Sequence, residues 1–307
     1  MSPAIAYAMT FLGVTGHASS EFFAVLSGVN GPEVSVWRYL LGALGLLAIC
    51  LVWPRHRDLL TPLRESWRAL VPLSIVGVSG AYLFFHWSLD YASVVQVGTM
   101  VTTIPIFVGL ANLLVNRIAI STAKLVSGAA AVLGVALLLT DGVLGQLAGD
   151  GRSLIGILMA LACAALGSFY AVMVKPYIQT YGAIRITTLS MAIGAIGLWL
   201  IVGAFFAIWV SPLDLFDKSS TAVASLVTLG FWNTTITQIL WLGGLAAVPD
   251  ITRGSYLFFL KPVITAFLAL AILGQPIGTI EMLAIVVICG SVLLELAWPR
   301  LVSRREA

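Results

Sequence analysis

Long uninterrupted runs of apolar residues dominate the chain, and short polar turns separate them. A transmembrane helix needs about 20 mostly apolar residues, whereas the strands of a membrane barrel alternate apolar and polar positions over about 10 residues. Because the runs are continuous, the pattern predicts membrane-spanning helices. We place ten spans at residues 4–27, 33–53, 69–89, 93–115, 121–140, 153–174, 182–209, 222–244, 251–272 and 279–297.

The composition supports this interpretation. The 307 residues are 60% hydrophobic and only 9% charged, whereas soluble domains carry about 25% charged residues. A soluble protein this apolar could not cover its surface with polar groups, so membrane lipid is the expected solvent. The net charge of +3 is spread over the turns and forms no basic stripe of the kind that binds nucleic acid.

The basic residues are divided unevenly between the two sides of the predicted bundle. With ten spans, both termini lie on one side. That side collects twelve basic residues: Arg55, Arg57, Arg64, Arg68, Arg117, Lys124, Lys175, Arg185, Arg253, Arg300, Arg304 and Arg305. The other side collects Arg38, Arg152 and Lys218. Since basic residues stay on the cytoplasmic side, we expect a multi-pass protein of the inner (plasma) membrane with both termini in the cytoplasm.

The two halves of the chain resemble each other. Glu21-Phe-Phe-Ala-Val matches Ser168-Phe-Tyr-Ala-Val, an ungapped continuation aligns Arg38 with Arg185, and Thr103-Ile-Pro105-Ile-Phe parallels Leu260-Lys-Pro262-Val-Ile. A repeat of five spans is odd, so the second copy crosses the membrane upside down, as in many transporters. We therefore expect an all-α integral membrane fold of two five-helix inverted repeats, residues 1–145 and 146–307.

Longer segments resemble a known family. FHWSLDYASVVQVGTMVTTIPIF, NRIAISTAKLVSGAAAVLGVALL and LGQPIGTIEMLAIVVICGSVLL are similar to the drug/metabolite transporter superfamily, and more narrowly to its EamA-type members. The resemblance implies ten helices in two inverted repeats and a central cavity lined by helices one, three, four, six, eight and nine. Within the superfamily, the chain most resembles exporters of aromatic amino acids. Many members carry Glu in the turns after spans four and nine, where this chain has Asn116 and Gln275.

Lys261 falls near the middle of the ninth span and is followed by Pro262. A charge at this depth usually faces a water-filled cavity or a partner. Either its ammonium group meets the carboxylate of an amino-acid-like solute, or it pairs with Glu21 and supports the fold. Pro262 and its counterpart Pro105 each remove a helical hydrogen bond. They predict paired bends, which either act as hinges for gating or shape the cavity as static kinks.

Two histidines are each followed by an acidic residue four positions later, and therefore on the same helix face. His17 and Glu21 form either a protonatable pair that couples export to protons or a structural hydrogen bond between helices. Asp90 is expected in solvent at the outer end of the third span. His86 lies deeper and is the better candidate for a cavity residue.

Aromatic residues fall in spans that the family uses for its cavity, and an aromatic wall would suit flat apolar side chains by stacking. Simple packing between helices is the alternative. Met100 would add an adaptable wall. The predicted substrate-binding residues are Tyr82, His86, Met100, Tyr170, Trp232, Tyr256 and Lys261, and the predicted gating or coupling residues are His17, Glu21, Pro105 and Pro262.

Two other classes of protein match parts of the sequence. Gly77-Val-Ser79-Gly fits the GxSG motif of rhomboid-type intramembrane proteases, which pair the serine with a histidine on another helix. Here His86 lies in the same span as Ser79, and His17 would have to reach across the bundle. A channel would need a selectivity filter or an ordered ring of charge, and the sequence shows neither.

The chain carries no nucleotide-binding loop and no metal-ligand spacing, so we expect no cofactor. Cys50, Cys163 and Cys289 fall far apart in apolar runs and are expected to be free thiols. The expected partners are membrane lipid and a small-molecule solute, and the sequence specifies no oligomeric state. We predict an alternating-access carrier that exports amino acids with aromatic or apolar side chains. The alternative is a multidrug or other metabolite carrier of the same fold.

Overall fold

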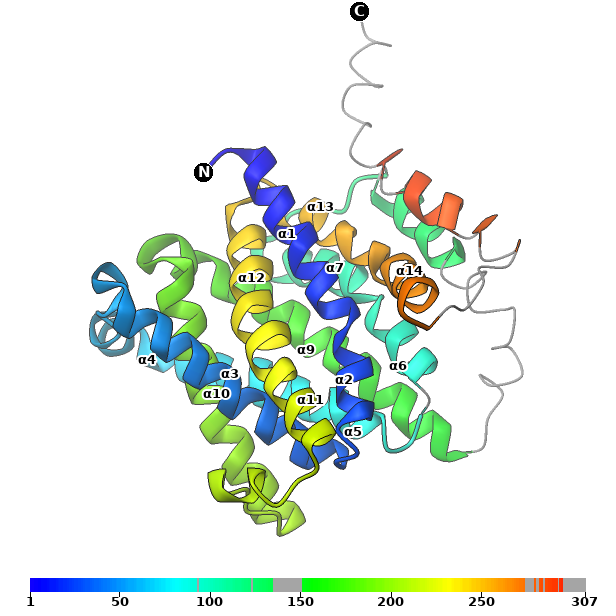
Figure 1. The fold of residues 1–307 in the computed structure, drawn as a ribbon. Helices are drawn as coiled ribbons and strands as arrows, with labels where there is room; N and C mark the ends of the chain where they lie inside the picture. Colours follow the sequence, from blue (N-terminus) through cyan, green and yellow to red (C-terminus); the bar gives the residue numbers. More distant parts are fainter. Residues whose placement is uncertain are drawn as a thin grey trace, which may run out of the picture.

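The computed structural model describes residues 1–92, 94–122, 124–134 and 151–273, and residues 279, 282–283, 285–291 and 293–294. All regular elements among these residues are helical (Figure 1). They are α1 Pro3–Ala18, α2 Ser20–Leu26, α3 Gly31–Val52, η1 Pro54–His56, α4 Leu60–Ser74, η2 Ile75–Gly80, α5 Ala81–Ser88, α6 Val94–Val101, α7 Ile104–Asn116, the helix Lys124–Gly134, α9 Gly151–Tyr181, α10 Ala183–Phe206, η3 Pro212–Leu215, α11 Ser220–Gly230, η4 Phe231–Ile236, α12 Thr237–Ala247, α13 Ile251–Ser255, η5 Tyr256–Leu260 and α14 Lys261–Leu273.

Four helical stretches are long and apolar enough to cross a membrane, and they confirm the prediction of apolar membrane helices at these places. They are Gly31–Val52, Pro54–Ser88, Leu154–Tyr181 and Ala183–Phe206. Four other predicted spans are built from shorter helices with a break or a change of helix type between them. The predicted boundary between residues 145 and 146 and most of the predicted tenth span lie outside the described residues.

The breaks in the fourth and ninth predicted spans lie just before the two prolines. Pro105 is the second residue of α7, and Pro262 is the second residue of α14, which follows the 3₁₀ turn η5. Proline is tolerated in the first turn because the N–H that it lacks would have no helical partner there. Pro105 therefore starts a new helix after a two-residue turn, and Pro262 lies where the 3₁₀ turn changes to α-helix. The predicted bends at the two prolines stay a prediction.

The third and eighth predicted spans share a different irregularity. Each contains six residues of π-helix between two α-helices, at η2 in the third span and η4 in the eighth. π-helical insertions are rare and occur frequently at functional sites. The third and eighth spans are equivalent positions in the predicted repeat. The two halves therefore share a feature that the sequence did not reveal.

Equivalent helices of the two halves make equivalent contacts with the opposite half. α1 packs against α12 in the way that α5 packs against α9, and α3 packs against α10 (Figure 1). Glycines allow α1 and α12 to approach closely: a Cβ atom on Gly13 would lie 2.8 Å from the backbone of Trp241. The first predicted span thus lies beside the eighth and the third beside the sixth, so the core forms between the two halves.

One assignment from the sequence alignment is wrong. Arg38 is the eighth residue of α3 and is fully buried, whereas Arg185 is the third residue of α10 and binds the backbone oxygen of Arg55 near the helix end. The two arginines therefore occupy different depths. The sequence prediction put Arg38 within the span 33–53 but on the outer side, whereas the structure buries it fully, so it joins Lys261 as a basic residue in the interior.

Candidate functional site

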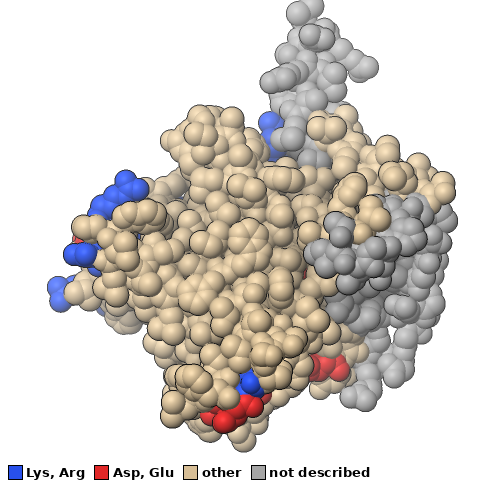
Figure 2. Space-filling model, in the orientation of Figure 1, with Lys and Arg blue, Asp and Glu red and all other residues tan. Residues whose placement is uncertain are grey.

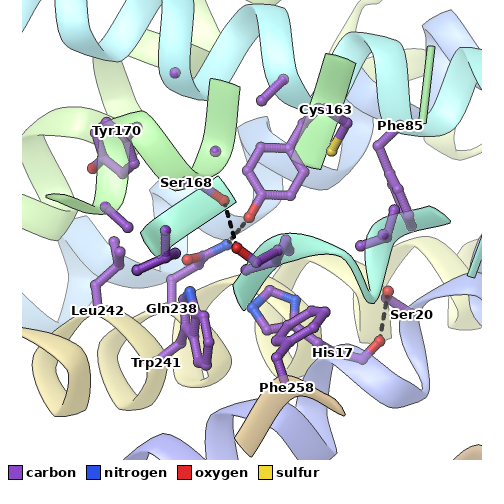
Figure 3. Close-up of a pocket in the computed structure, with 18 of the residues that line it drawn as sticks. His17, Ser20, Phe85, Cys163, Ser168, Tyr170, Gln238, Trp241, Leu242 and Phe258 are labelled. Carbon is purple, nitrogen blue, oxygen red and sulfur yellow. Dashed lines mark hydrogen bonds between the residues drawn. The ribbon is translucent and has the colours of Figure 1, made fainter. Parts of the chain in front are cut away.

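An internal cavity of about 50 Å³ lies among helices from both halves of the chain (Figure 3). A water molecule needs about 10–15 Å³ of such space, so this conformation admits a few water molecules. A solute of amino-acid size requires the helices to move apart. The walls combine aromatic rings with polar groups: Phe85, Trp241 and Phe258 among the former, and His17, Arg38, Tyr82, Tyr170, Gln238 and Lys261 among the latter.

Arg38 places a guanidinium group in the wall of this cavity. Its Nε donates to Thr234 Oγ1 at 3.0 Å, and its Nη2 donates to the Asn233 carbonyl oxygen at 2.9 Å. Both acceptors lie in η4, so the π-helical segment helps to hold the arginine. Among the described residues, no carboxylate lies within ion-pair distance of Arg38. A buried charge without a counterion is costly, so the cavity favours an occupant that carries negative charge.

His86 lies behind Arg38 and outside the cavity wall. Its Nε2 is 3.2 Å from Nη1 of Arg38, and its Nδ1 is 2.9 Å from Ser35 Oγ and 3.0 Å from the Tyr82 carbonyl oxygen. Arginine can only donate, so Nε2 accepts and the proton sits on Nδ1. The structure therefore places His86 as a neutral support for Arg38, whereas the sequence predicted contact with solute.

Lys261 lines the cavity and forms an ion pair with Glu21. Both side chains are about 4% exposed, and Ser20 Oγ donates to the second oxygen of Glu21 at 3.1 Å. The ammonium group also lies 5.8 Å from the centre of the Phe85 ring and 5.7 Å from that of Phe258. Lys261 thus fits both of its predicted positions, because it lines the cavity and also pairs with the Glu21 carboxylate.

Two polar groups of the cavity wall have no hydrogen-bond partner among the described residues: His17 Nε2 and the Tyr170 hydroxyl. The His17 ring packs against Trp241 and Phe258, at centroid distances of 5.8 and 5.6 Å (Figure 3). His17 and Glu21 therefore face different partners and do not form the pair suggested by their spacing. Buried polar atoms without a partner are uncommon, and a bound solute or water would satisfy these two.

Tyr82, a predicted substrate-binding residue, lies on the polar side of the cavity. Its hydroxyl accepts a hydrogen bond from Gln238 Nε2 at 2.6 Å, and its ring lies 4.6 Å from that of Tyr39. Gln238 and Trp241 both come from α12 and point into the cavity (Figure 3). Gln238, Trp241, Phe85, Phe258 and Arg38 were missed as site residues in the sequence. Only Arg38 carried a usable signal, as a charge inside an apolar run.

Three other predicted residues lie away from the cavity wall. Trp232 is 37% exposed, and its indole N–H donates to Ser19 Oγ at 3.2 Å. Tyr256 is buried at one end of the molecule, where its hydroxyl donates to the Lys124 carbonyl oxygen. Met100 is half-buried against the core. Pro105 and Pro262 adjoin the cavity residues Ile104 and Lys261 in sequence.

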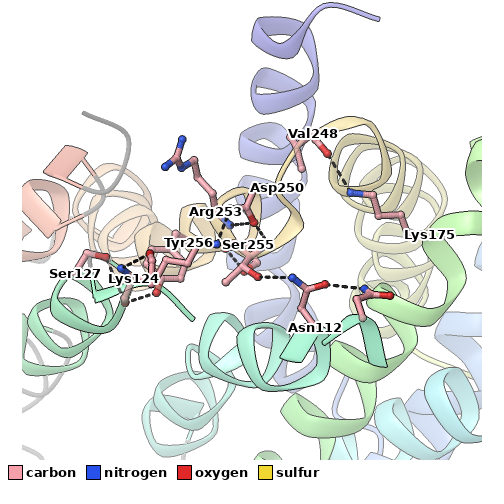
Figure 4. Close-up of polar contacts among 12 residues, drawn as sticks. Asn112, Lys124, Ser127, Lys175, Val248, Asp250, Arg253, Ser255 and Tyr256 are labelled. Atoms are coloured by element: carbon pink, nitrogen blue, oxygen red, sulfur yellow. Dashed lines mark hydrogen bonds and ion pairs between the residues drawn. The ribbon is translucent and has the colours of Figure 1, made fainter. Parts of the chain in front are cut away.

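Polar contacts close the end of the molecule where α13 begins (Figure 4). Lys124 Nζ lies 2.6 Å from Asp250 Oδ2, and Asn112 Nδ2 donates to Thr252 Oγ1 at 3.4 Å. Asp250 also caps α13 by accepting from the backbone N–H groups of Thr252 and Arg253. Partial burial acts to raise the pKa of Asp250, but the hydrogen bond and charge of Lys124 outweigh it and hold that pKa below its usual value.

The serine of the GxSG sequence has a structural partner. Ser79 Oγ donates to the Gly194 carbonyl oxygen at 2.8 Å and is fully buried between η2 and α10. Among the described residues, no histidine contacts it: His86 binds Ser35, Tyr82 and Arg38. The hydroxyl joins two helices, and nothing in its surroundings activates it as a nucleophile.

Comparison with known proteins gives three findings. Residues 3–140 and 154–296 match the EamA-like transporter family. A protein of Clostridium kluyveri described as an uncharacterized transporter is 25% identical over 281 residues, which make up 91% of this chain and 88% of that protein. A crystal structure of a protein is similar over 99% of both chains, with a TM-score of 0.77 and 19% identity, which shows a shared fold.

Proposed function

Because the chain belongs to the EamA-like transporter family, we propose that it is an alternating-access carrier that exports amino acids with aromatic or apolar side chains. The coarser part of this statement, an integral membrane transporter of a small solute, follows from the family and the apolar spans. The observation that carries the finer part is the cavity, which Arg38 lines together with aromatic side chains and where no carboxylate of the described residues pairs with it.

The charges of the cavity suit a zwitterion. Arg38 and Lys261 contribute two positive charges, and Glu21, the partner of Lys261, contributes one negative charge, so the cavity is net positive even when its histidine, His17, is counted as neutral. An amino-acid carboxylate would bind the free N–H groups of Arg38, since such charge-assisted bonds are the strong ones. The solute ammonium group would compete with Lys261 for Glu21. A cationic drug would meet the same net positive wall, which disfavours the multidrug alternative.

The aromatic residues would hold the solute side chain. Phe85, Trp241 and Phe258 line the cavity, and the first and last of these flank the Lys261 ammonium group. Aromatic rings pack edge-to-face or offset at centroid distances of about 4.5–7 Å, and the pairs among the wall residues already lie in this range, with 5.1 Å between Trp241 and Phe258. A flat side chain could enter this cluster after modest separation of η5 from α12.

The proposal includes two inverted repeats, residues 1–145 and 146–307, with both termini in the cytoplasm. Its support is the exchange pattern of helix packing, the paired π-helical segments and the two separate matches to one family. In this orientation, the contact between Lys124 and Asp250 closes the cytoplasmic mouth. The helix starts at Pro105 and Pro262 would be the points about which the gates move.

Efflux from proteoliposomes tests the function. Liposomes containing the purified protein are loaded with labelled phenylalanine, tryptophan or threonine, and efflux is compared with that from protein-free liposomes. We expect saturable efflux, fastest for the aromatic solutes. Efflux equal to that of the protein-free liposomes for all three solutes would remove the amino-acid assignment. An ohmic current would replace the carrier with a channel.

A further inference from the structure

A second hollow lies between α4 and α9, next to the cavity described above. It is a groove of about 400 Å³ that opens to the outside of the helix bundle. Side chains at helical spacing form its two walls: Arg68, Pro72 and Val76 on one side, and Leu166, Met173 and Tyr177 on the other. Apart from Arg68 and the tyrosine hydroxyl groups, these walls are apolar, and Val76 is 53% exposed.

The length of the groove matches one leaflet of a bilayer. Along the first wall it runs from Arg68 to Gly77, a distance of nine residue steps, which corresponds to about 14 Å at 1.5 Å per step. Half of a hydrocarbon core of about 30 Å is about 15 Å. One end of the groove therefore lies at headgroup depth when the other lies near the middle of the membrane, and the apolar length fits an acyl chain.

The headgroup end of the groove is basic. Arg68 is exposed there and lines the groove, whereas Arg64, one turn earlier on α4, is exposed but lies outside the groove lining. Basic side chains gather at the edge of the molecule where α4 lies (Figure 2). Trp67, 53% exposed, adds an aromatic residue of the kind that anchors proteins at the membrane interface. The nearby carboxylate of Glu65 already accepts a hydrogen bond from the Tyr181 hydroxyl at 2.7 Å.

The inner end of the groove meets the wall of the central cavity. Gly77 and Tyr170 line both hollows. The helical segments η2 and α9 touch closely here, because a Cβ atom on Gly77 would lie 2.4 Å from Cβ of Tyr170. Gly77 also belongs to the π-helical segment η2. A molecule bound in the groove would therefore contact Gly77 and Tyr170, which lie between the groove and the central cavity.

We propose that this groove is a binding site for one anionic phospholipid of the leaflet next to α4, the cytoplasmic leaflet in the orientation given above. The phosphate binds Arg68, and one acyl chain lies between α4 and α9 and ends against Gly77 and Tyr170. An anionic headgroup complements the basic end, and anionic lipids are enriched in the cytoplasmic leaflet. This site is distinct from the solute cavity and does not depend on which solute is carried.

Native mass spectrometry of the purified protein tests the site. The protein is delipidated in detergent, incubated with phosphatidylglycerol or phosphatidylcholine of the same chain length, and the retained lipid is measured. We expect one phosphatidylglycerol to be retained in preference to phosphatidylcholine. Arg68→Gln should reduce its retention about fivefold, the factor expected for one basic side chain at the membrane surface. Arg64→Gln, outside the groove lining, is the matched control and should leave retention unchanged.

A second pair of variants tests the acyl-chain part. Val76→Trp fills the groove and should abolish retention, whereas Leu200→Trp, at an exposed apolar position on α10, should not. Equal retention of both lipids, or equal effects of Arg68→Gln and Arg64→Gln, would overturn the proposal in favour of unspecific surface lipid. A lipid-free dimer that Val76→Trp dissociates would assign the groove to a second copy of the chain. Since the readout is lipid mass, a failure here leaves the solute proposal standing.

Discussion

Arg38 and His86 lie side by side in the fully buried core, with Nη1 of the arginine 3.2 Å from Nε2 of the histidine. The arginine faces the cavity and the histidine does not. The sequence assigned His86 to solute and did not assign Arg38 to the site, whereas in the structure it is Arg38 that lines the cavity. Arg38 presents charge to the cavity, and His86 fixes the direction of its guanidinium group.

Replacing Arg38 tests its role as the receptor for a carboxylate. Arg38→Gln removes the charge and should raise the KM for amino-acid efflux about tenfold to hundredfold, since hydrogen bonds to charged groups contribute about 1.5–3 kcal/mol. Arg185→Gln, near the start of α10 and outside the cavity wall, is the control and should leave efflux unchanged. Unchanged KM in Arg38→Gln would exclude the arginine from solute binding. A solute without a carboxylate should lose little in the variant.

Variants of His86 test whether this residue stabilises the fold through its hydrogen bond with Arg38. His86→Leu leaves Nη1 of Arg38 without this acceptor and should lower the free energy of unfolding by about 1–3 kcal/mol. His86→Gln keeps a side-chain oxygen that can accept, so it should recover part of that loss. Thermal unfolding in detergent measures both. If the two variants unfold at the same temperature, the hydrogen bond to Arg38 contributes nothing measurable to stability.

Much of the fold could be predicted from the sequence because lipid imposes simple rules. Apolar runs of membrane length identify α3, α9 and α10 directly. The interruptions at Ser19, at η2 and at η4 could not be predicted, because neighbouring helices and side chains satisfy the freed backbone groups. Thr234 and Thr235 show this: in addition to the contacts that each makes with α3, both hydroxyl groups bind carbonyl oxygens five residues earlier.

The sequence predicted the candidate site only in part, because it fixes neither the rotation of each helix in the bundle nor the depth of each residue in the membrane. Tyr82, Tyr170, His17 and Lys261 line the cavity, whereas Trp232 and Tyr256 do not. Helical periodicity fixes the relative directions of residues on one helix, but it does not give the rotation of that helix in the bundle. Arg38 was assigned to the outer side because a positive charge near a predicted span end resembles an interfacial residue.

Glu21 and Lys261 provide a double-mutant test. Glu21→Gln or Lys261→Met alone leaves one charge buried without its partner and should cost about 3–5 kcal/mol of stability. The double variant removes both charges and should cost clearly less than the sum of the single changes. Unfolding in detergent measures the coupling. Additive losses would mean that the ion pair does not exist in solution, and full efflux by Lys261→Ala would exclude the lysine from solute recognition.

Two variants of Asp250 distinguish its ion pair with Lys124 from its role as the N-cap of α13. Asp250→Asn keeps a good N-cap residue and removes the charge that binds Lys124, whereas Asp250→Ala loses both, at a further cost of about 1 kcal/mol. We expect Asp250→Asn to expose the nearby end of the cavity. Labelling of a cysteine placed at Asn112 by a membrane-impermeant thiol reagent should be faster in this variant than in an Asp217→Asn control. Equal labelling rates would show that the ion pair does not hold this end closed.

The lowered pKa of Asp250 predicts the pH dependence of this contact. A carboxyl group whose pKa is lower in the folded protein stabilises the fold above its ordinary pKa of about 3.9. That contribution is lost as the pH falls through the lowered value. Labelling and stability should therefore be independent of this pair between about pH 5 and 8, and should change only in stronger acid. A transition near pH 6 that Asp250→Asn abolishes would contradict this assignment.

Tyr170 and Tyr82 carry hydroxyl groups in the same cavity but in opposite situations, so their phenylalanine variants should differ in sign. The Tyr82 hydroxyl accepts from Gln238, and Tyr82→Phe should cost about 1–3 kcal/mol because it leaves a buried amide donor without this partner. The Tyr170 hydroxyl makes no hydrogen bond of normal geometry among the described residues, although the Ser190 hydroxyl lies near it, so Tyr170→Phe should unfold at the same or a higher temperature than the wild type. Solute should raise the unfolding temperature of the wild type more than that of Tyr170→Phe if the hydroxyl binds it. A large loss of stability in Tyr170→Phe without solute would show instead that this hydroxyl already has a structural partner.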